Sequence, residues 1–85
     1  MNELKRRLWE EMVAQPGRPP ALTKKRLKVL EEKLANDAGF WADLLQRHGL
    51  ADKRLGDLEP STREHAVGNF WGMVMQAAHE IGMKI

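Results

Sequence analysis

Apolar residues recur at steps of three and four over most of the chain, a spacing that places side chains on one face of an α-helix. The longest such stripe lies in the last quarter, from Ser61 to Ile85. Ser61 and Glu64 have the spacing of a reciprocal capping box, which predicts that this helix begins at Ser61. We expect the stripe to supply the largest share of the core. Its apolar members are Val67, Phe70, Trp71, Val74, Ala77, Ala78, Ile81 and Ile85.

Two shorter helices are expected in the first half of the chain. Asn2 can cap a helix that runs to about Gln15. The segment from Pro16 to Leu22 cannot be helical, because its prolines lack a backbone N–H and its glycine permits a turn. Thr23 can then cap a second helix. The buried stripes expected on these two helices are Leu4, Leu8, Met12 and then Leu27, Leu30, Leu34.

Asp37 can cap a third helix, and Gly49 has the position of a left-handed residue that ends it. A short fourth helix is expected from Asp52 to Leu58. The pattern therefore predicts an all-α single domain over residues 1–85, a small bundle of four to five short helices with a long apolar C-terminal helix. We divide it into an N-terminal helix (1–15), a Pro/Gly linker (16–22) and a helical core (23–85). The C-terminal helix is expected to pack against the segments Leu27 to Leu34 and Phe40 to Leu45.

Composition narrows the class of protein. The 85 residues include no cysteine, which argues against a disulfide-stapled secreted domain and makes the cytoplasm the expected location. No apolar run approaches the roughly 20 residues that cross a bilayer, so we expect no membrane segment. The formal net charge is only +2, but eight of the fourteen Lys and Arg residues precede Val29. The position of the cations is therefore more informative than their total.

Five of these cations form what we call the basic strip: Arg18, Lys24, Lys25, Arg26 and Lys28. Three of them occupy the first turn of the second helix, where the helix dipole favours carboxylates over cations. Selection for helix stability alone would not place them there. The strip is therefore a candidate contact for an acidic partner, either a carboxylate-rich protein face or a phosphate backbone. A charge run that only solvates the surface is an equally good explanation.

A second candidate surface lies on the C-terminal helix. Gly68, Gly72, Met75 and His79 share one side of it, and we call them the glycine strip. A glycine in a helix interior costs about 1 kcal/mol relative to alanine, a cost that close approach of another backbone offsets. That backbone belongs either to this chain or to a partner.

Catalytic and metal-binding patterns are missing. The chain has no tyrosine and no cysteine, and its one serine is assigned to a helix cap. The three histidines, His48, His65 and His79, lack the spacing of metal ligands to one another. No glycine-rich phosphate loop is present. We therefore expect no catalytic residues, no metal, no cofactor and no enzymatic activity.

Two hypotheses of function remain. The first is a small non-enzymatic regulator or adaptor of bacterial, phage or mobile-element type, which binds an acidic protein partner through the basic strip and the glycine strip. Self-association as a homodimer is a variant of it. The alternative is a DNA-binding module with a helix-turn-helix between Phe40 and Leu58. In that case the basic residues on DNA would be Arg18, Lys24, Lys25, Arg26, Lys53 and Arg54.

Overall fold

Three of the helices begin where a short polar side chain accepts a hydrogen bond from the backbone N–H three residues later. In the computed structural model, which describes residues 1–85, these donor–acceptor distances are 2.9 Å at Asn2, 3.3 Å at Thr23 and 3.0 Å at Asp37. All three caps agree with the sequence prediction. The elements are α1 (Glu3–Val13), α2 (Lys24–Leu34), α3 (Ala38–Arg47), the 3₁₀ turn η1 (Leu55–Asp57) and α4 (Pro60–Glu80).

The start of α4 differs from the prediction. The helix begins at Pro60, and no side chain caps it, so the expected Ser61–Glu64 capping box is not formed. Proline suits the first helical position because its ring fixes a helical φ and no N–H is needed there. Ser61 therefore becomes the second residue of the helix.

The expected fourth helix from Asp52 to Leu58 is also wrong. The structure has only the three-residue turn η1 in this segment. Gly56 lies in its middle and disfavours continued helix. The side chains of Leu55 and Leu58 are nevertheless buried in the core.

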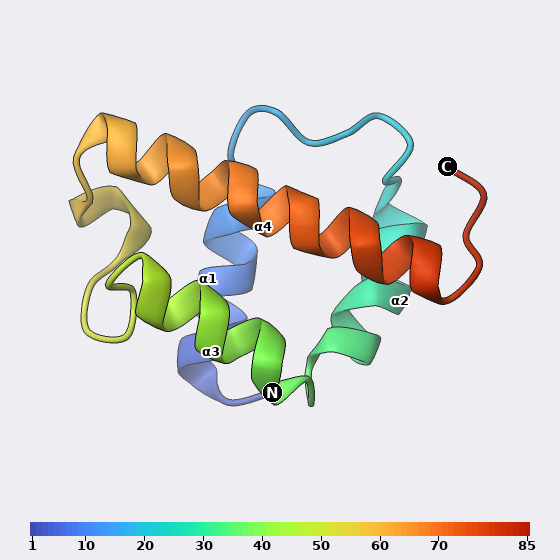
Figure 1. The fold of residues 1–85 in the computed structure, drawn as a ribbon, viewed down its shortest axis with the longest axis horizontal. Helices are drawn as coiled ribbons and strands as arrows, with labels where there is room; N and C mark the ends of the chain where they lie inside the picture. Colours follow the sequence, from blue (N-terminus) through green and yellow to red (C-terminus); the bar gives the residue numbers. More distant parts are fainter.

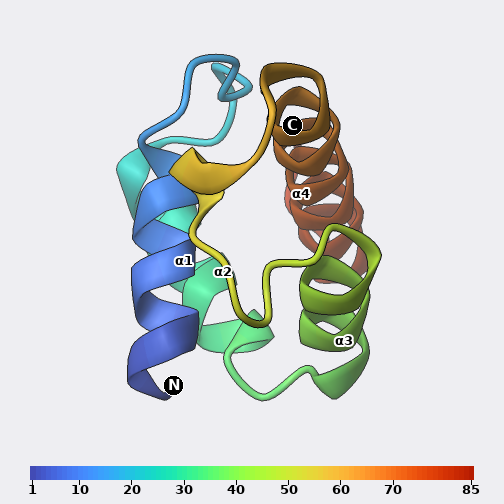
Figure 2. The same ribbon diagram turned by 90° about the vertical axis from the view of Figure 1, so that its left-hand side faces the viewer.

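The four helices form two layers. Figure 2 shows α1 and α2 on one side of the molecule and α3 and α4 on the other. Figure 1 shows α4 running the length of the molecule, with α2 behind its C-terminal half and α3 beside it. The contacts of α4 with α2 and α3 confirm the packing predicted from the sequence.

The core between the layers is entirely apolar. Nineteen residues are buried, and none is polar or charged. Aromatic rings pack together across three helices. The ring centroids of Trp9 in α1 and Phe70 in α4 are 5.2 Å apart, and those of Phe70 and Phe40 in α3 are 6.1 Å apart. Trp41 donates its indole N–H to the carbonyl of Leu34 at 2.9 Å, which ties α3 to the end of α2.

The stripe of α4 is buried over most of its length. Phe70, Trp71, Val74, Ala77 and Ala78 lie in the core, and Ala66 joins them in place of the half-buried Val67. Ile81 was expected in the core but is 42% exposed, because the helix has ended at Glu80.

Gly82 turns the chain after α4. Its φ of 79° is in the left-handed region that glycine adopts at low cost. The N–H of Met83 then donates to the carbonyl of Ala78 at 2.9 Å. The last residues consequently fold back beside α2, as Figure 1 shows. None of the helices is both long and apolar enough to cross a membrane.

Candidate partner-binding surface

The basic strip lies at the start of α2 and in the linker before it. Arg18, Lys24, Lys25 and Lys28 are exposed. None of the five cations of the strip has a carboxylate oxygen within 4.0 Å, since the ion pairs of the chain are Lys33 with Glu80, Arg47 with Asp43, and Arg54 with Glu11. The strip is thus a concentration of positive charge that the chain itself does not neutralise.

Arg26 differs from the other members of the strip. It is half-buried, and its guanidinium donates to the carbonyl of Ala21 at 2.7 Å. This bond spans the junction between linker and helix and fixes the direction in which α2 leaves the linker. Arg26 therefore has a structural partner, while its remaining N–H groups stay available to a ligand.

An open hollow lies against the strip. It has a volume of about 480 Å³ and is lined by Thr23, Lys25, Arg26, Val29 and Met83. Val29 is 45% exposed and is one of the two large apolar side chains that the surface leaves exposed. Met83 reaches this place through the turn at Gly82 and is half-buried. The apolar side chains of Val29 and Met83 thus line the same hollow as the cations of Lys25 and Arg26.

Val29 and Met83 belong to this surface, although the sequence pattern did not predict either of them there. Val29 is separated by one turn from Lys25, so its place on the exposed face of α2 follows from helical spacing. The place of Met83 depends on where the C-terminal segment folds back. No local pattern predicts that contact.

The glycine strip lies on the outer side of α4. Gly68, Gly72 and His79 are exposed, and Met75 is half-buried. A Cβ atom built on Gly68 or Gly72 would have no neighbour within 4 Å. No part of this chain therefore approaches these glycines closely, and internal packing does not offset their cost to the helix.

The residues of the DNA-binding alternative are arranged less favourably. Arg54 binds the carboxylate of Glu11 with two guanidinium nitrogens, and this hydrogen bond and charge raise the pKa of Arg54. Glu11 also accepts from the backbone N–H of Leu55 at 3.4 Å, so the pair holds η1 against α1. Lys53 is exposed without a carboxylate partner. The turn η1 takes the place of the second helix expected between Asp52 and Leu58, so the predicted helix-turn-helix is not formed.

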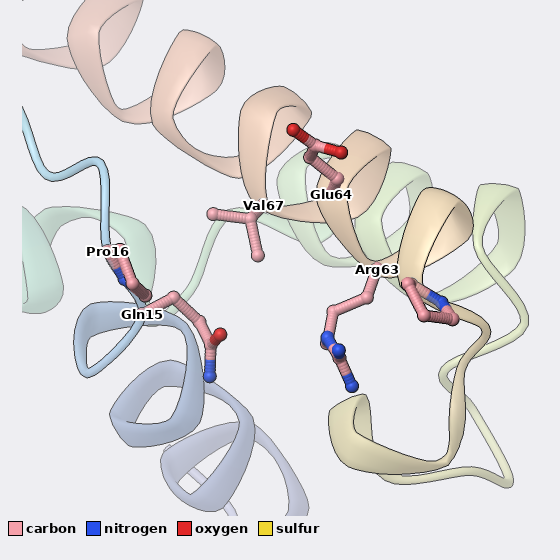
Figure 3. A pocket seen from close by; sticks show the side chains of 6 residues that line it. Gln15, Pro16, Arg63, Glu64 and Val67 are labelled. Atoms are coloured by element: carbon pink, nitrogen blue, oxygen red, sulfur yellow. The ribbon is translucent and has the colours of Figure 1, made fainter.

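A further hollow, of about 370 Å³, lies where the end of α1 meets the start of α4. Figure 3 shows that Arg63 and Glu64 point in opposite directions there, and that Val67 points toward Gln15 and Pro16. The amide of Gln15 is already bound to the carbonyl of Glu11 at 3.3 Å. Polar groups therefore do not converge on a common point in this hollow.

A polar cluster joins α3 to α4. The side-chain amide nitrogen of Asn69 lies 3.1 Å from Asp43 Oδ2 and 3.2 Å from His48 Nε2. Burial, the cation of Arg47 and the nearby His65 lower the pKa of His48, and the carboxylate of Asp43 opposes this shift only in part. A neutral His48 accepts from Asn69, so the cluster binds α3 to α4 best without a proton on Nε2.

Comparisons with protein-family models, with curated proteins and with solved structures found no match to this chain.

Proposed function

We propose that this protein is a small non-enzymatic regulator or adaptor that binds an acidic face of another protein through the basic strip. The observation that carries this proposal is the group of exposed cations Arg18, Lys24, Lys25 and Lys28, which have no carboxylate partner. Lys25 also lines a hollow together with the exposed side chain of Val29. Unneutralised charge on a surface steers an oppositely charged partner and sets its orientation.

The position of these cations adds a second argument. Lys24 and Lys25 occupy the first turn of α2. There the positive end of the helix dipole repels a cation, which destabilises the helix by about 0.3–1 kcal/mol for each lysine. A contact with a partner's carboxylates gives these residues a role that helix stability does not.

A protein partner accounts for the surface better than DNA does. An adjacent apolar side chain suits the desolvated centre of a protein interface, whereas phosphate groups are contacted by charged and polar groups. The DNA-binding alternative also loses some support, because Arg54 is paired with Glu11 and η1 replaces the helix that was expected from Asp52 to Leu58.

The test is a capture experiment with a charge-reversed variant. The wild-type protein is used as bait in an extract of its own source, and each captured protein is then purified and tested alone for direct binding. Lys24→Glu/Lys25→Glu should reduce the affinity for the true partner at least ~10-fold, because attraction becomes repulsion. The variant should remain folded, because carboxylates in the first turn stabilise a helix.

Lys53→Glu is the matched control. It makes one Lys→Glu reversal, half the change of charge in the double variant, at an exposed lysine between α3 and η1, away from the basic strip. We expect it to leave the affinity unchanged. Equal losses in both variants, or no loss in either, would contradict the proposal. Steeply salt-dependent binding to duplex DNA that Lys24→Glu/Lys25→Glu abolishes would favour the alternative function.

A further inference from the structure

The hollow beside the basic strip combines apolar lining groups with adjacent cations, which suits it to bind one side chain of a partner. Its lining includes the apolar groups of Val29 and Met83, and its edge includes the cations of Lys25 and Arg26. Val29 is exposed to 45%, although nearly all other large apolar side chains are covered. The cost of this exposure would be removed by an apolar group seated on it.

Charge is distributed unevenly along this face of α2. Lys24, Lys25 and Lys28 precede Val29 in the sequence, and all are exposed. Glu32 is exposed one turn after Val29, and the next cation, Lys33, is paired with Glu80 at 3.9 Å. The positive end of the helix dipole adds to the field of the lysines at the start of α2. Along α2, the exposed cations without a carboxylate partner therefore lie on the N-terminal side of Val29.

We infer that the hollow binds an acidic amphipathic segment of the partner, with one large apolar side chain seated on Val29 and Met83 and flanking carboxylates on Lys25 and Arg26. This inference rests on the proposed function and specifies the chemistry of the partner. Arg26 suits the task because its bond to Ala21 already holds its side chain in place, so less rotamer entropy is lost when it binds. Helical segments of this composition commonly dock by an apolar face into a groove.

The experiment uses two labelled synthetic peptides and fluorescence anisotropy at moderate ionic strength. The first peptide is an amphipathic helix with leucines on one face and glutamates elsewhere, and the second has glutamine in place of every leucine. The full-length protein should bind the leucine peptide at least ~10-fold more tightly, because one buried large apolar side chain contributes about 1.5–3 kcal/mol.

Val29→Ser should remove most of this preference, with little change in the affinity for the glutamine peptide. Ile81→Ser is the matched control, because Ile81 is the other exposed large apolar residue and does not line the hollow. It should leave the preference intact. Met83→Gln changes the second apolar residue that lines the hollow and should act in the same direction as Val29→Ser. Both peptides should lose affinity in Lys25→Glu.

Equal binding of the two peptides would overturn the inference but leave the proposed function standing, because a purely electrostatic contact would remain. No binding of either peptide would also overturn it, and the capture experiment with Lys24→Glu/Lys25→Glu would then decide the proposed function separately. Tighter Lys25-dependent binding to duplex DNA or to anionic lipid vesicles than to the leucine peptide would show that the surface binds a different kind of anion. That result would contradict both this inference and the proposed function.

Discussion

At the scale of single residues, Gly68 and Gly72 are the clearest departure from what the fold requires. Both lie inside α4, and neither is close to another part of the chain. Their φ angles are not in the left-handed region, so an alanine fits the backbone without strain. Helix stability and internal packing therefore give no reason for glycine at these positions.

We predict that Gly68→Ala and Gly72→Ala each stabilise the protein by about 0.5–1 kcal/mol, the usual difference between the two residues inside a helix. The free energy of unfolding from urea titrations measures this effect. Gly39→Ala, at the start of α3, is a comparison because its Cβ would lie in ordinary contact 3.5 Å from Asp37 Oδ1. A destabilised Gly68→Ala or Gly72→Ala variant would indicate a packing role that the structure does not contain.

Gly72→Leu separates the glycine strip from the fold. The larger side chain would extend into open space, so the fold should persist. If the strip is part of the partner interface, this variant should lose affinity for the captured partner, whereas Gly72→Ala should lose less. Unchanged affinity in both variants would limit the interface to the basic strip.

His48 makes stability depend on pH. Its pKa is lowered in the folded protein, mainly by burial and next by Arg47, so the unfolded chain binds the proton more readily. The contribution of His48 to stability is therefore complete above its ordinary pKa of about 6.5 and is lost as the pH falls below that value toward the folded-state pKa. Protonation also places an N–H against the amide of Asn69.

We predict a lower urea midpoint at about pH 5.5 than at about pH 7.5, with part of this difference missing in His48→Gln. Glutamine keeps an acceptor near Asn69 but does not titrate. His79→Gln, which changes an exposed histidine of α4, should keep the full difference. Identical pH profiles for wild type and His48→Gln would show that His48 has no role in it.

At the scale of helices, side-chain caps mark where α1, α2 and α3 begin, whereas α4 begins at Pro60 without one. Thr23 Oγ1 accepts from the N–H of Arg26, whereas Ser61 accepts no such bond in α4. Thr23→Ala should therefore destabilise the protein by about 1 kcal/mol, while Ser61→Ala should change stability by less than about 0.5 kcal/mol. Thermal and urea unfolding of the two variants would measure the difference. Equal losses would contradict the start of α4 at Pro60.

The elements that local sequence determines were predictable. Asn2, Thr23 and Asp37 each satisfy an amide three residues later, so their signal is contained within one turn. The segment around η1 was not predictable, because Glu11 holds it through Arg54 and the N–H of Leu55, contacts that span more than forty residues. Such a contact leaves no periodic trace in the sequence.

The candidate site divides in the same way. The basic strip was visible as a run of cations with the wrong sign for a helix start. The hollow was not, since Met83 joins Val29 only after Gly82 has reversed the chain at the end of α4. Arg54 was predicted as a cation available to DNA, but it is paired with Glu11. Its sequence neighbours give no sign of this ion pair.

At the scale of the whole molecule, two layers of helices enclose an apolar core and leave charge at the surface. All nineteen buried residues are of apolar types, and every charged side chain lies at least partly at the surface. The distinctive surface is at the end of the molecule where the start of α2 and the C-terminal segment meet, which Figure 1 shows at one side of the ribbon. A binding role is consistent with a fold that places its unpaired charge and an exposed apolar side chain together.

The most direct test of this account is a nuclear magnetic resonance titration of the labelled protein with its captured and purified partner. Binding through the proposed surface predicts that the largest shifts occur at Lys24, Lys25, Val29 and Met83, with Lys53 and Arg54 unaffected. If the largest shifts instead fall between α3 and η1, the proposed surface is not the interface and the central claim is wrong.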